Sequence, residues 1–366
     1  MMHYLDANAT EPLRPEARDA MLAACGITGN PSSVHGAGRA ARRVMEDSRE
    51  TLAARFGCQP GDLVFTSGGT EADALAVHAL GQGRRLVIGA TEHDAIRAAA
   101  PDATLVPVLS NGPIDLDVLA GILSAGPPAL VCLMLANNET GTIQPVAEAA
   151  ALCRVHGARL HVDAVQAAGR MAVNLGALGA SSIAISSHKI GGPTGVGALL
   201  LAPEHSSVVP LIRGGGQERG RRGGTPPVAA IAGFAAAAMA AVGTEALAAL
   251  RDAAERAAVI HGAMVVGGDA PRLGNTTCLA LPGARADMQV IALDLEGVAV
   301  SAGAACSSGK VAASHVLAAM GLGALAGQAI RVSLPWNASA ADVDAFAAAY
   351  ARMADRLRSP LVSRAA

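Results

Sequence analysis

Aromatic side chains are scarce in this sequence, since phenylalanine, tryptophan and tyrosine together make up 2% of 366 residues. Hydrophobic residues nevertheless account for 51%, so a sizeable core is possible, and it must be built from alanine, leucine, valine and isoleucine. Charged residues amount to only 16%, which argues against a chain that is disordered throughout. The formal net charge of −2 provides no excess of positive charge for a general nucleic-acid or anionic-membrane surface.

Long hydrophobic runs are also missing. The N-terminus, MMHYLDANATEPLRPEA, has no basic stretch followed by an apolar one, so it does not predict a signal peptide. The most apolar window, residues 228–242, is shorter than the ~20 residues that a membrane-spanning helix needs, and its composition favours a packed helix. We therefore expect a cytoplasmic protein that does not bind membranes.

The six cysteines form no pattern that would bind a metal or indicate disulfides. They are scattered, with no CxxC pair and no histidine cluster at metal-ligand spacing, and without an export signal they should be reduced thiols. Cys306 differs from the others, because it lies in SAGAACSSGK, a run of small residues with no clear preference for helix or strand. Burial is the default expectation for Cys25, Cys58, Cys132, Cys153 and Cys278.

The first two-thirds of the chain alternate between short apolar runs and stretches with helical spacing. Such alternation predicts an α/β domain with a largely parallel sheet, in which ligands gather beyond the carboxyl ends of the strands. The expected strands are residues 63–66, 85–90, 104–109, 129–136, 159–165, 182–187 and 197–202. The expected helices between them are residues 70–80, 115–124 and 145–157.

After about residue 245 the pattern changes to that of a second, α+β domain, and the length of the chain suits one large domain plus a smaller one. We expect residues 15–245 to form the large domain, and residues 1–14 and 246–366 to form the small domain that carries the Cys306 loop. The expected elements of the small domain are helices over 244–261, from about 314 and over 340–358, with strands near 275–281, 297–301 and 328–334.

Polar residues that directly follow strands are the first candidates for a site. SGGTEADAL follows the strand 63–66, and its glycines and threonine open a helix whose backbone N–H groups suit a phosphate, although glycine turns before helices are common. NNETG, residues 137–141, follows another strand and is as consistent with an Asx turn as with a ligand contact.

Asp163 and Lys189 follow successive strands, so their side chains should be neighbours. Asp163 alone could cap a helix, but a lysine between an apolar strand and a glycine loop is poorly explained as a surface charge. The glycines of GGPTGVG resemble a nucleotide fingerprint, yet the stretch runs into a strand, so we discard that interpretation. A lysine amine that can form a Schiff base, an acid for a pyridinium nitrogen and a phosphate seat are together what pyridoxal phosphate requires.

The sequence also resembles a known family over essentially its whole length. It is similar to the class V, fold-type I pyridoxal-phosphate enzymes, and among them to the cysteine desulfurases of the NifS/IscS kind. That fold type implies a mostly parallel central sheet flanked by helices. The resemblance rests on ten motifs in the same order: YLDANAT, GNPSSVH, FTSGGTEAD, TEHDA, NNETG, HVDAVQ, SSHKIGGPTGVGAL, GGGQERGRRGGT, SAGAACSSG and IRVSL.

The resemblance implies a role in cofactor binding for many of the residues in these motifs. Lys189 would bind the cofactor covalently, Asp163 would pair with its pyridine nitrogen, Gln166 would bond its 3-oxygen, and His93 would stack on the ring face. Asn138 would contact both cofactor and substrate. The phosphate would be held by Gly69, Thr70, Ser186 and His188, and by Thr225 of the other subunit of a homodimer.

The resemblance also implies a substrate and a nucleophile. Arg331 and Asn138 would bind the α-carboxylate of L-cysteine, with Asn30 as a weaker candidate. A thiolate at Cys306 would attack the substrate's sulfur, leaving a persulfide on the enzyme and alanine as product. The sulfur would then pass to an acceptor protein for iron–sulfur clusters or other sulfur-containing cofactors. Docking to an iron–sulfur scaffold is doubtful, because only about 35 residues follow Arg331.

Two alternative functions stay open at this stage. A selenocysteine lyase, or another class V lyase or aminotransferase, would share the cofactor residues and have less need of a thiol. A non-catalytic sulfur-relay module would have kept the fold, although the presence of both Lys189 and Cys306 weighs against it. The stretch ERGRR, residues 218–222, taken alone resembles a small basic nucleic-acid patch, but the resemblance assigns it to the dimer interface.

Overall fold

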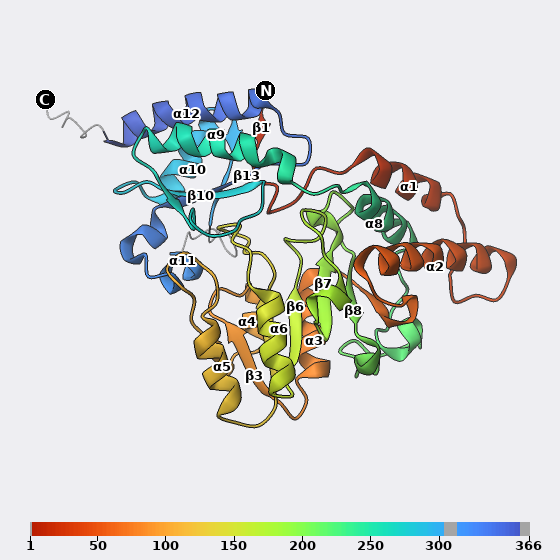
Figure 1. Cartoon of the computed structure of the whole chain (residues 1–366). Coiled ribbons are helices and arrows are strands. Elements are labelled where there is room, and N and C mark those ends of the chain that lie inside the picture. The colour runs from red at the N-terminus through yellow and green to blue at the C-terminus, as the bar shows by residue number, and fades with distance from the viewer. Residues whose placement is uncertain (1, 304–312, 359–366) are drawn as a thin grey trace, which may run out of the picture.

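The computed structural model describes residues 2–303 and 313–358, and it places them in a larger and a smaller α/β unit (Figure 1). In the larger unit, strands form one seven-stranded sheet in the order β2-β8-β7-β6-β5-β3-β4. All are parallel except β8, which runs antiparallel to both of its neighbours. The strands are β2 (Leu63–Thr66), β3 (Arg85–Gly89), β4 (Thr104–Val106), β5 (Ala129–Met134), β6 (Arg159–Asp163), β7 (Ser182–Ser186) and β8 (Gly197–Leu201).

These strands match the seven that the apolar runs predict, which confirms the predicted fold class for this unit. Every residue of β5, β7 and β8 is buried, as expected for strands covered on both faces. β4 is shorter than predicted and ends at Val106, because Pro107 follows and cannot donate a backbone hydrogen bond to the ladder.

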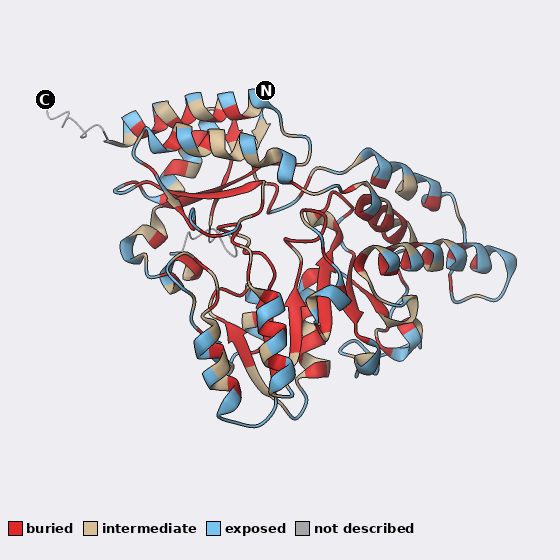
Figure 2. Ribbon diagram, viewed as in Figure 1, coloured by how far each residue is buried: buried red, intermediate tan, exposed pale blue. Residues whose placement is uncertain are grey.

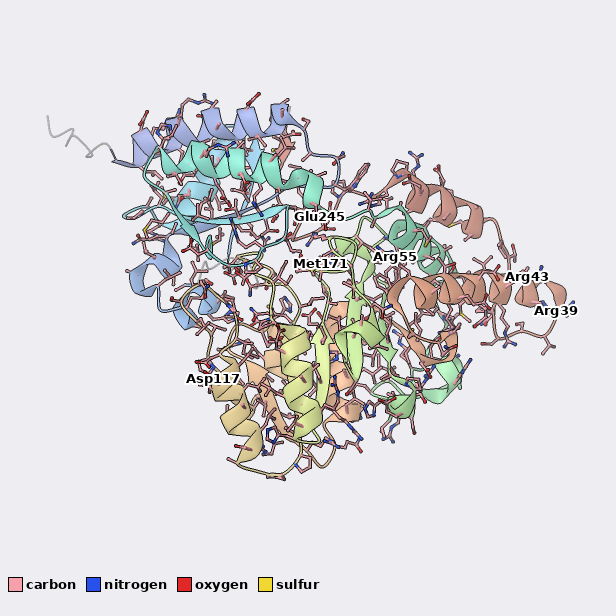
Figure 3. The ribbon with its side chains drawn as sticks, viewed as in Figure 1. Arg39, Arg43, Arg55, Asp117, Met171 and Glu245 are labelled. Atoms are coloured by element: carbon pink, nitrogen blue, oxygen red, sulfur yellow. The ribbon has the colours of Figure 1, made fainter. Side chains whose placement is uncertain are left out.

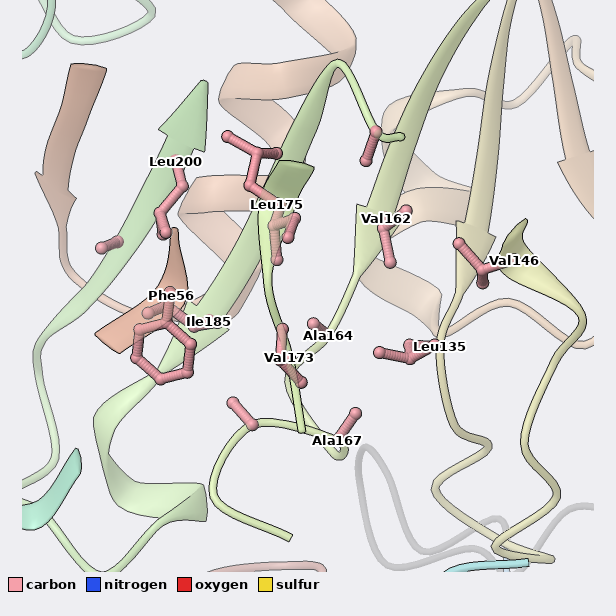
Figure 4. Close-up of a cluster of buried hydrophobic side chains, with 14 of the residues drawn as sticks. Phe56, Leu135, Val146, Val162, Ala164, Ala167, Val173, Leu175, Ile185 and Leu200 are labelled. Atoms are coloured by element: carbon pink, nitrogen blue, oxygen red, sulfur yellow. The ribbon is translucent and has the colours of Figure 1, made fainter. Parts of the chain in front are cut away.

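Helices cover both faces of this sheet. On one face α3 packs with the side chains of Ala184 and Leu199, while Val162 and Ile185 point into the larger core on the other face (Figure 4). The helices of this unit are α1 (Pro15–Cys25), α2 (Gly36–Phe56), α3 (Gly69–Leu80), α4 (Asp94–Ala99), α5 (Leu116–Ser124), α6 (Val146–Val155), α7 (Leu175–Leu178) and α8 (Val228–Ala240). Short 3-10 turns complete it: η1 (Pro60–Asp62), η2 (Ser187–Lys189), η3 (Pro203–His205) and η4 (Gln217–Gly220).

The alanine-rich helix α8 packs against α1 and α2, and most of its residues are buried (Figure 2). Gly233 permits this packing, because a Cβ there would lie 2.5 Å from Cγ of Met21 on α1. Arg39 and Arg43 project from the opposite, exposed side of α2 (Figure 3). Within residues 2–303 and 313–358, no single helix meets the length and hydropathy required to cross a membrane; α8 and the segment Glu245–Val259 meet them only as a pair bent by 64°.

The smaller unit is an antiparallel sheet in the order β12-β13-β10-β9 with helices packed against it. The predicted strand over 297–301 is divided into β11 and β12, and the helix predicted from residue 244 begins with the 3-10 turn η5 (Glu245–Leu247). Its strands are β9 (Met264–Val266), β10 (Thr276–Ala280), β11 (Val298–Ala299), β12 (Ser301–Ala302) and β13 (Ala329–Ser333). Its helices are α9 (Ala248–Val259), α10 (Ala286–Leu295), α11 (His315–Ala319) and α12 (Ala340–Arg358), with the 3-10 turn η6 (Gly323–Gly327).

The N-terminal residues join the smaller unit although His3 and its strand partner Val298 are 295 positions apart in sequence. β1 (His3–Tyr4) pairs in parallel with β11, and Leu5 packs in a core that includes Phe346 and Tyr350. This pairing is consistent with the expected assignment of residues 1–14 to the small domain, whose boundaries stay a prediction.

A buried ion pair ties the loop around η4 to the larger sheet. The Glu218 carboxylate accepts hydrogen bonds from both terminal nitrogens of Arg49, at 2.9 and 2.7 Å, and from the backbone N–H of Phe65 at 2.9 Å. Glu218 takes up a left-handed backbone conformation, with φ of 49°, which L side chains rarely adopt. Removal of its carboxylate would leave the buried Arg49 guanidinium with Glu46, a more exposed carboxylate 3.0 Å from Nε, as its counter-charge.

We therefore predict that Glu218→Ala lowers the free energy of unfolding by about 3–5 kcal/mol, the usual cost of breaking a buried ion pair on one side. Chemical denaturation of the purified protein measures this change. The exposed Glu204→Ala is the matched control and should change the stability by less than about 0.5 kcal/mol. An equal effect of the two substitutions would contradict the structural role of Glu218.

Candidate active site

A pocket of about 290 Å³ lies at the carboxyl ends of β5, β6 and β7, between the two units. The larger unit contributes most of its walls, and Ser301, Gly303 and Arg331 of the smaller unit line it as well. The structure brings together here ten of the residues that the sequence analysis singled out: Gly69, Thr70, His93, Asn138, Asp163, Gln166, Ser186, His188, Lys189 and Arg331.

Lys189 ends the 3-10 turn η2, which directly follows β7. Its Nζ donates hydrogen bonds to the backbone carbonyls of Asn8, at 2.6 Å, and Ala9, at 2.8 Å. Both carbonyls belong to the N-terminal segment, so residues 180 positions apart in sequence position the amine. Its neighbour Ile190 is buried in the large core, which anchors the turn.

Asp163 is the last residue of β6 and is buried. Its Oδ1 accepts a hydrogen bond from the backbone N–H of Val165 at 2.9 Å. The carboxylate therefore also stabilises the local turn that follows β6. Burial raises the pKa of this carboxyl, while the nearby His93 and Lys189 act to lower it. Burial likewise raises the pKa of Asp73 and of Glu92, and the charge of Asp163 adds to both increases. A cationic group bound near Asp163 would stabilise its ionised form.

A buried histidine lies beside Asp163 on the same strand. Nε2 of His161 is 3.1 Å from Oδ1 of Asp73, and its Nδ1 is 2.8 Å from Oγ of Ser182. Burial lowers the pKa of His161 to about 3, so the ring is neutral at physiological pH.

The phosphate seat predicted at the start of α3 is a close-packed glycine turn. A Cβ on Gly69 would lie 2.6 Å from Cγ2 of Val165, and a Cβ on Gly197 would lie 2.7 Å from the backbone carbon of Gly68. Only glycine fits at these two positions, and Gly69 and Thr70, at the N-terminus of α3, line the pocket together with Ser186. His188 also lines the pocket, and burial together with the Lys189 charge lowers its pKa to about 4.

Arg331 on β13 enters the pocket from the smaller unit. Its Nη2 is 2.6 Å from Oδ1 of Asp6, and its Nη1 donates to the backbone carbonyl of Asn138 at 3.1 Å. Its Nε is buried and has no hydrogen-bond partner within the part of the chain that the structure describes. The guanidinium therefore keeps a donor available to an anion in the pocket.

Two of the predicted site residues that the structure describes do not line this pocket. Asn30 is exposed, and its Oδ1 accepts the backbone N–H of Ser32 at 2.8 Å. Thr225 is exposed in the loop that precedes α8. Cys306 lies outside the described residues.

The chain on both sides of the Cys306 segment is nevertheless held at the pocket. Gly303 packs so closely on Glu139 that a Cβ there would lie 2.4 Å from Oε2. The same oxygen accepts the Ser314 hydroxyl at 2.6 Å, and His315 Nε2 is 3.0 Å from the Glu92 carbonyl. One carboxylate thus contacts the residues that precede and follow the segment.

Sequence reasoning missed several residues of the site. Asp6 and Asn8 belong to the motif YLDANAT, but the motif alone does not predict which residues they contact. Asp73 follows the predicted phosphate turn by one helical turn, and helical spacing alone would have placed it on the face that packs against the sheet.

The chain matches the family model described as Aminotransferase class-V over residues 3–346. It is 39% identical to an IscS-like cysteine desulfurase of Mycobacterium tuberculosis, over 94% of each chain. It is 40% identical to a cysteine desulfurase of Cereibacter sphaeroides, over 97% of this chain and 96% of that one. Among solved structures, a NifS-like protein from Rickettsia africae has a TM-score of 0.90 at 33% identity and covers 97% of this chain and 100% of its own.

The neutral state of His161 leads to a prediction about pH. Unfolded histidine binds its proton near pH 6.5, whereas His161 in the fold binds one near pH 3. Between these values the unfolded state binds more protons, so the contribution of His161 to stability falls as the pH falls. Relative to His161→Gln, the wild type should lose about 2 kcal/mol of unfolding free energy between pH 6.5 and pH 5.

Chemical denaturation of both proteins across this pH range measures the difference. The buried carboxyls with raised pKa act in the opposite direction, since they stabilise the fold at low pH, and subtracting the variant from the wild type removes their shared contribution. Parallel pH profiles for the two proteins would mean that His161 is not held neutral.

Proposed function

The chain belongs to the class-V aminotransferases and, among them, to the cysteine desulfurases, and on this premise we propose how its own residues perform the reaction. The enzyme is a pyridoxal-phosphate-dependent desulfurase that converts L-cysteine to alanine and keeps the sulfur as a persulfide on Cys306. The observation that carries the proposal is the placement of Lys189 and Asp163 in one pocket that Arg331 enters from the smaller unit.

The residues of the pocket fit the cofactor. Gly69, which packs too closely on Val165 to carry a Cβ, lies at the N-terminus of the 12-residue helix α3, and a helix N-terminus suits a phosphate. Asp163 is a buried carboxyl whose ionised form gains from a protonated pyridine nitrogen. His93 lines the same pocket and offers a flat ring surface. When bound to Lys189, the cofactor supplies an electron sink for the α-carbon of the substrate.

Lys189 and Arg331 would divide the work on the amino acid. Arg331 binds the α-carboxylate, because its buried Nε is an unsatisfied donor and guanidinium matches carboxylate geometry. The Lys189 amine, once the substrate has released it, accepts the α-proton of the substrate at Nζ. It later donates a proton from Nζ to the product. The carbonyls of Asn8 and Ala9, both within 2.8 Å, hold that amine in place when it is protonated.

The sulfur is removed by the thiolate of Cys306. It attacks the sulfur of the bound cysteine, a sulfur–sulfur bond forms, and the bond between that sulfur and the β-carbon breaks. The electron pair goes to the β-carbon, which takes up a proton, so the product is alanine and the enzyme holds a persulfide. A thiol-bearing acceptor protein must then take the sulfur.

The partner assignments are proposals of the same kind. Thr225 lies outside the pocket of its own chain, as a residue that reaches a partner subunit's site would in a homodimer. Nearby, Arg222 forks onto the Glu71 carboxylate at 2.9 and 3.1 Å, which ties the Thr225 loop to α3. The cytoplasmic location and the identity of the sulfur acceptor stay predictions.

The first test concerns the nucleophile. Cys306→Ser should keep the visible absorption of the bound cofactor and lower sulfide release from L-cysteine, with a reductant present, by roughly 1,000-fold or more. Cys58→Ser is the control, because burial and Asp62 raise the pKa of that thiol to about 12 and it lies outside the pocket.

Normal turnover by Cys306→Ser would show that another group accepts the sulfur. Borohydride reduction followed by peptide mapping is the companion experiment, since a pyridoxyl mark is expected on Lys189. Absence of that mark would favour a non-catalytic relay. Faster turnover of selenocysteine than of cysteine, with no dependence on Cys306, would favour a selenocysteine lyase.

The second test concerns substrate binding. Arg331→Gln should raise KM for L-cysteine and lower kcat/KM by roughly 100-fold, since two hydrogen bonds to a charged group together contribute about 3 kcal/mol. The control is Arg352→Gln, which breaks an exposed ion pair between Arg352 on α12 and Glu296. It should leave KM and kcat/KM unchanged. A kcat effect at Arg331 without any change in KM would contradict its assignment to the carboxylate.

A further inference from the structure

The carboxamide of Gln166 lies next to the Lys189 amine. Nε2 of Gln166 donates to the backbone carbonyl of Asn8 at 3.0 Å, and Lys189 Nζ donates to the same oxygen at 2.6 Å. Two donors that share one acceptor are close neighbours. The amide group of Gln166 therefore borders the atom that would bind the cofactor.

Arg170 lies behind this carboxamide, on the side away from the pocket. It is 2% exposed, it does not line the pocket, and its Nη1 donates to Oε1 of Gln166. Guanidinium carries N–H donors only and has no acceptor. The end of the carboxamide that faces Arg170 must consequently be the oxygen, and the end that faces Lys189 must be the nitrogen.

Several further contacts keep the guanidinium in this position. Nη2 donates to the backbone carbonyl of Ala7 at 3.1 Å and is 3.4 Å from Oε1 of Glu11. Glu11 is itself held by the backbone N–H of Trp336, which donates to Oε2 at 3.2 Å. The buried charge of Arg170 thus has a counter-charge, and its donors are directed by a backbone segment and by Glu11.

We propose that Arg170 is a positioning residue that fixes the Gln166 carboxamide with its nitrogen toward Lys189. The side chain of Gln166 is then a dedicated hydrogen-bond donor to an anionic oxygen of the group that Lys189 binds. Without Arg170 this orientation would be held by the donation from Nε2 to the Asn8 carbonyl, and rotation of the carboxamide by half a turn would become easier. The rotated carboxamide would present its oxygen, which would repel that anion. This inference rests on the proposed cofactor at Lys189.

The test is a pH titration of the visible absorption band of the holoenzyme, which reports the pKa of the linkage between cofactor and Lys189. A donor to the anionic oxygen favours the deprotonated linkage. Its loss should raise this pKa by about one unit, because a hydrogen bond to a charged group contributes about that much. Arg170→Met should therefore raise the pKa, and Arg170→Lys, which keeps a donor and the charge, should largely restore it.

Removal of a cation raises the same pKa by electrostatics alone, so the orientation effect must be isolated. The charged and titratable groups around the linkage are Asp163, His93, His188, Glu11 and Arg331, and none is altered in these variants. Arg170→Met should shift the pKa less in a Gln166→Leu background than in the wild type. Equal shifts in the two backgrounds would overturn the proposal.

A second comparison does not require Arg170 to be changed and decides the matter if Arg170→Met fails to fold. Gln166→Glu keeps an oxygen for Arg170 and loses the donor, so it should raise the pKa at least as much as Gln166→Leu. A titration like that of the wild type for Gln166→Glu would show that the nitrogen is not the functional end. The exposed Arg256→Met is the control and should leave the titration unchanged.

These outcomes are separate from failure of the proposed function. A protein that forms no visible band and no borohydride-trapped adduct at Lys189 would refute the cofactor assignment and the inference with it. A band whose pKa is indifferent to Arg170 and Gln166 would refute the inference alone. Steady-state kinetics add a further readout, since an orientation effect on the cofactor should lower kcat more than it raises KM.

Discussion

The hydrogen bonds that the Asn8 carbonyl accepts are the contact on which the pocket depends. That oxygen accepts hydrogen bonds from Lys189 and from Gln166. Residues on either side of Asn8 make further contacts to the site. Asp6 contacts Arg331 of the smaller unit, and the Glu11 backbone N–H donates to the His188 carbonyl at 2.9 Å. The turn around Asn8 therefore connects the Lys189 turn of the larger unit to strand β13 of the smaller unit, which carries Arg331.

The electrostatics of the pocket depend on a small number of charged groups. Asp73, Glu92 and Asp163 are buried carboxyls, and burial raises the pKa of each. The charge of Asp163 adds to the increase at Asp73 and Glu92. A cation bound beside Asp163 would favour its ionised form, while Arg331 and the N-terminus of α3 supply positive potential to the same pocket.

The sequence predicts best those strands in which neighbouring residues are apolar, because such runs indicate burial directly. β5 is a continuous apolar run, and β7 has an apolar centre between two serines. Asp163 and Lys189 stand out because Asp163 ends β6 and Lys189 comes shortly after β7. β12 escaped a clear prediction because Ser301 and Ala302 have no strong strand preference and pair only through Arg331 and Ile330 of β13. Arg170 could not be recognised as part of the site, since its partners Ala7 and Glu11 lie 163 and 159 positions away.

The position of the N-terminal segment has a consequence for folding during translation. Asp6 and Asn8 meet Arg331 and Ser333, 325 residues later in the chain. Asp6 and Asn8 therefore remain without these native partners until the 325 residues that separate each pair have been synthesised. The large sheet can assemble during translation, whereas the catalytic centre is among the last features to form.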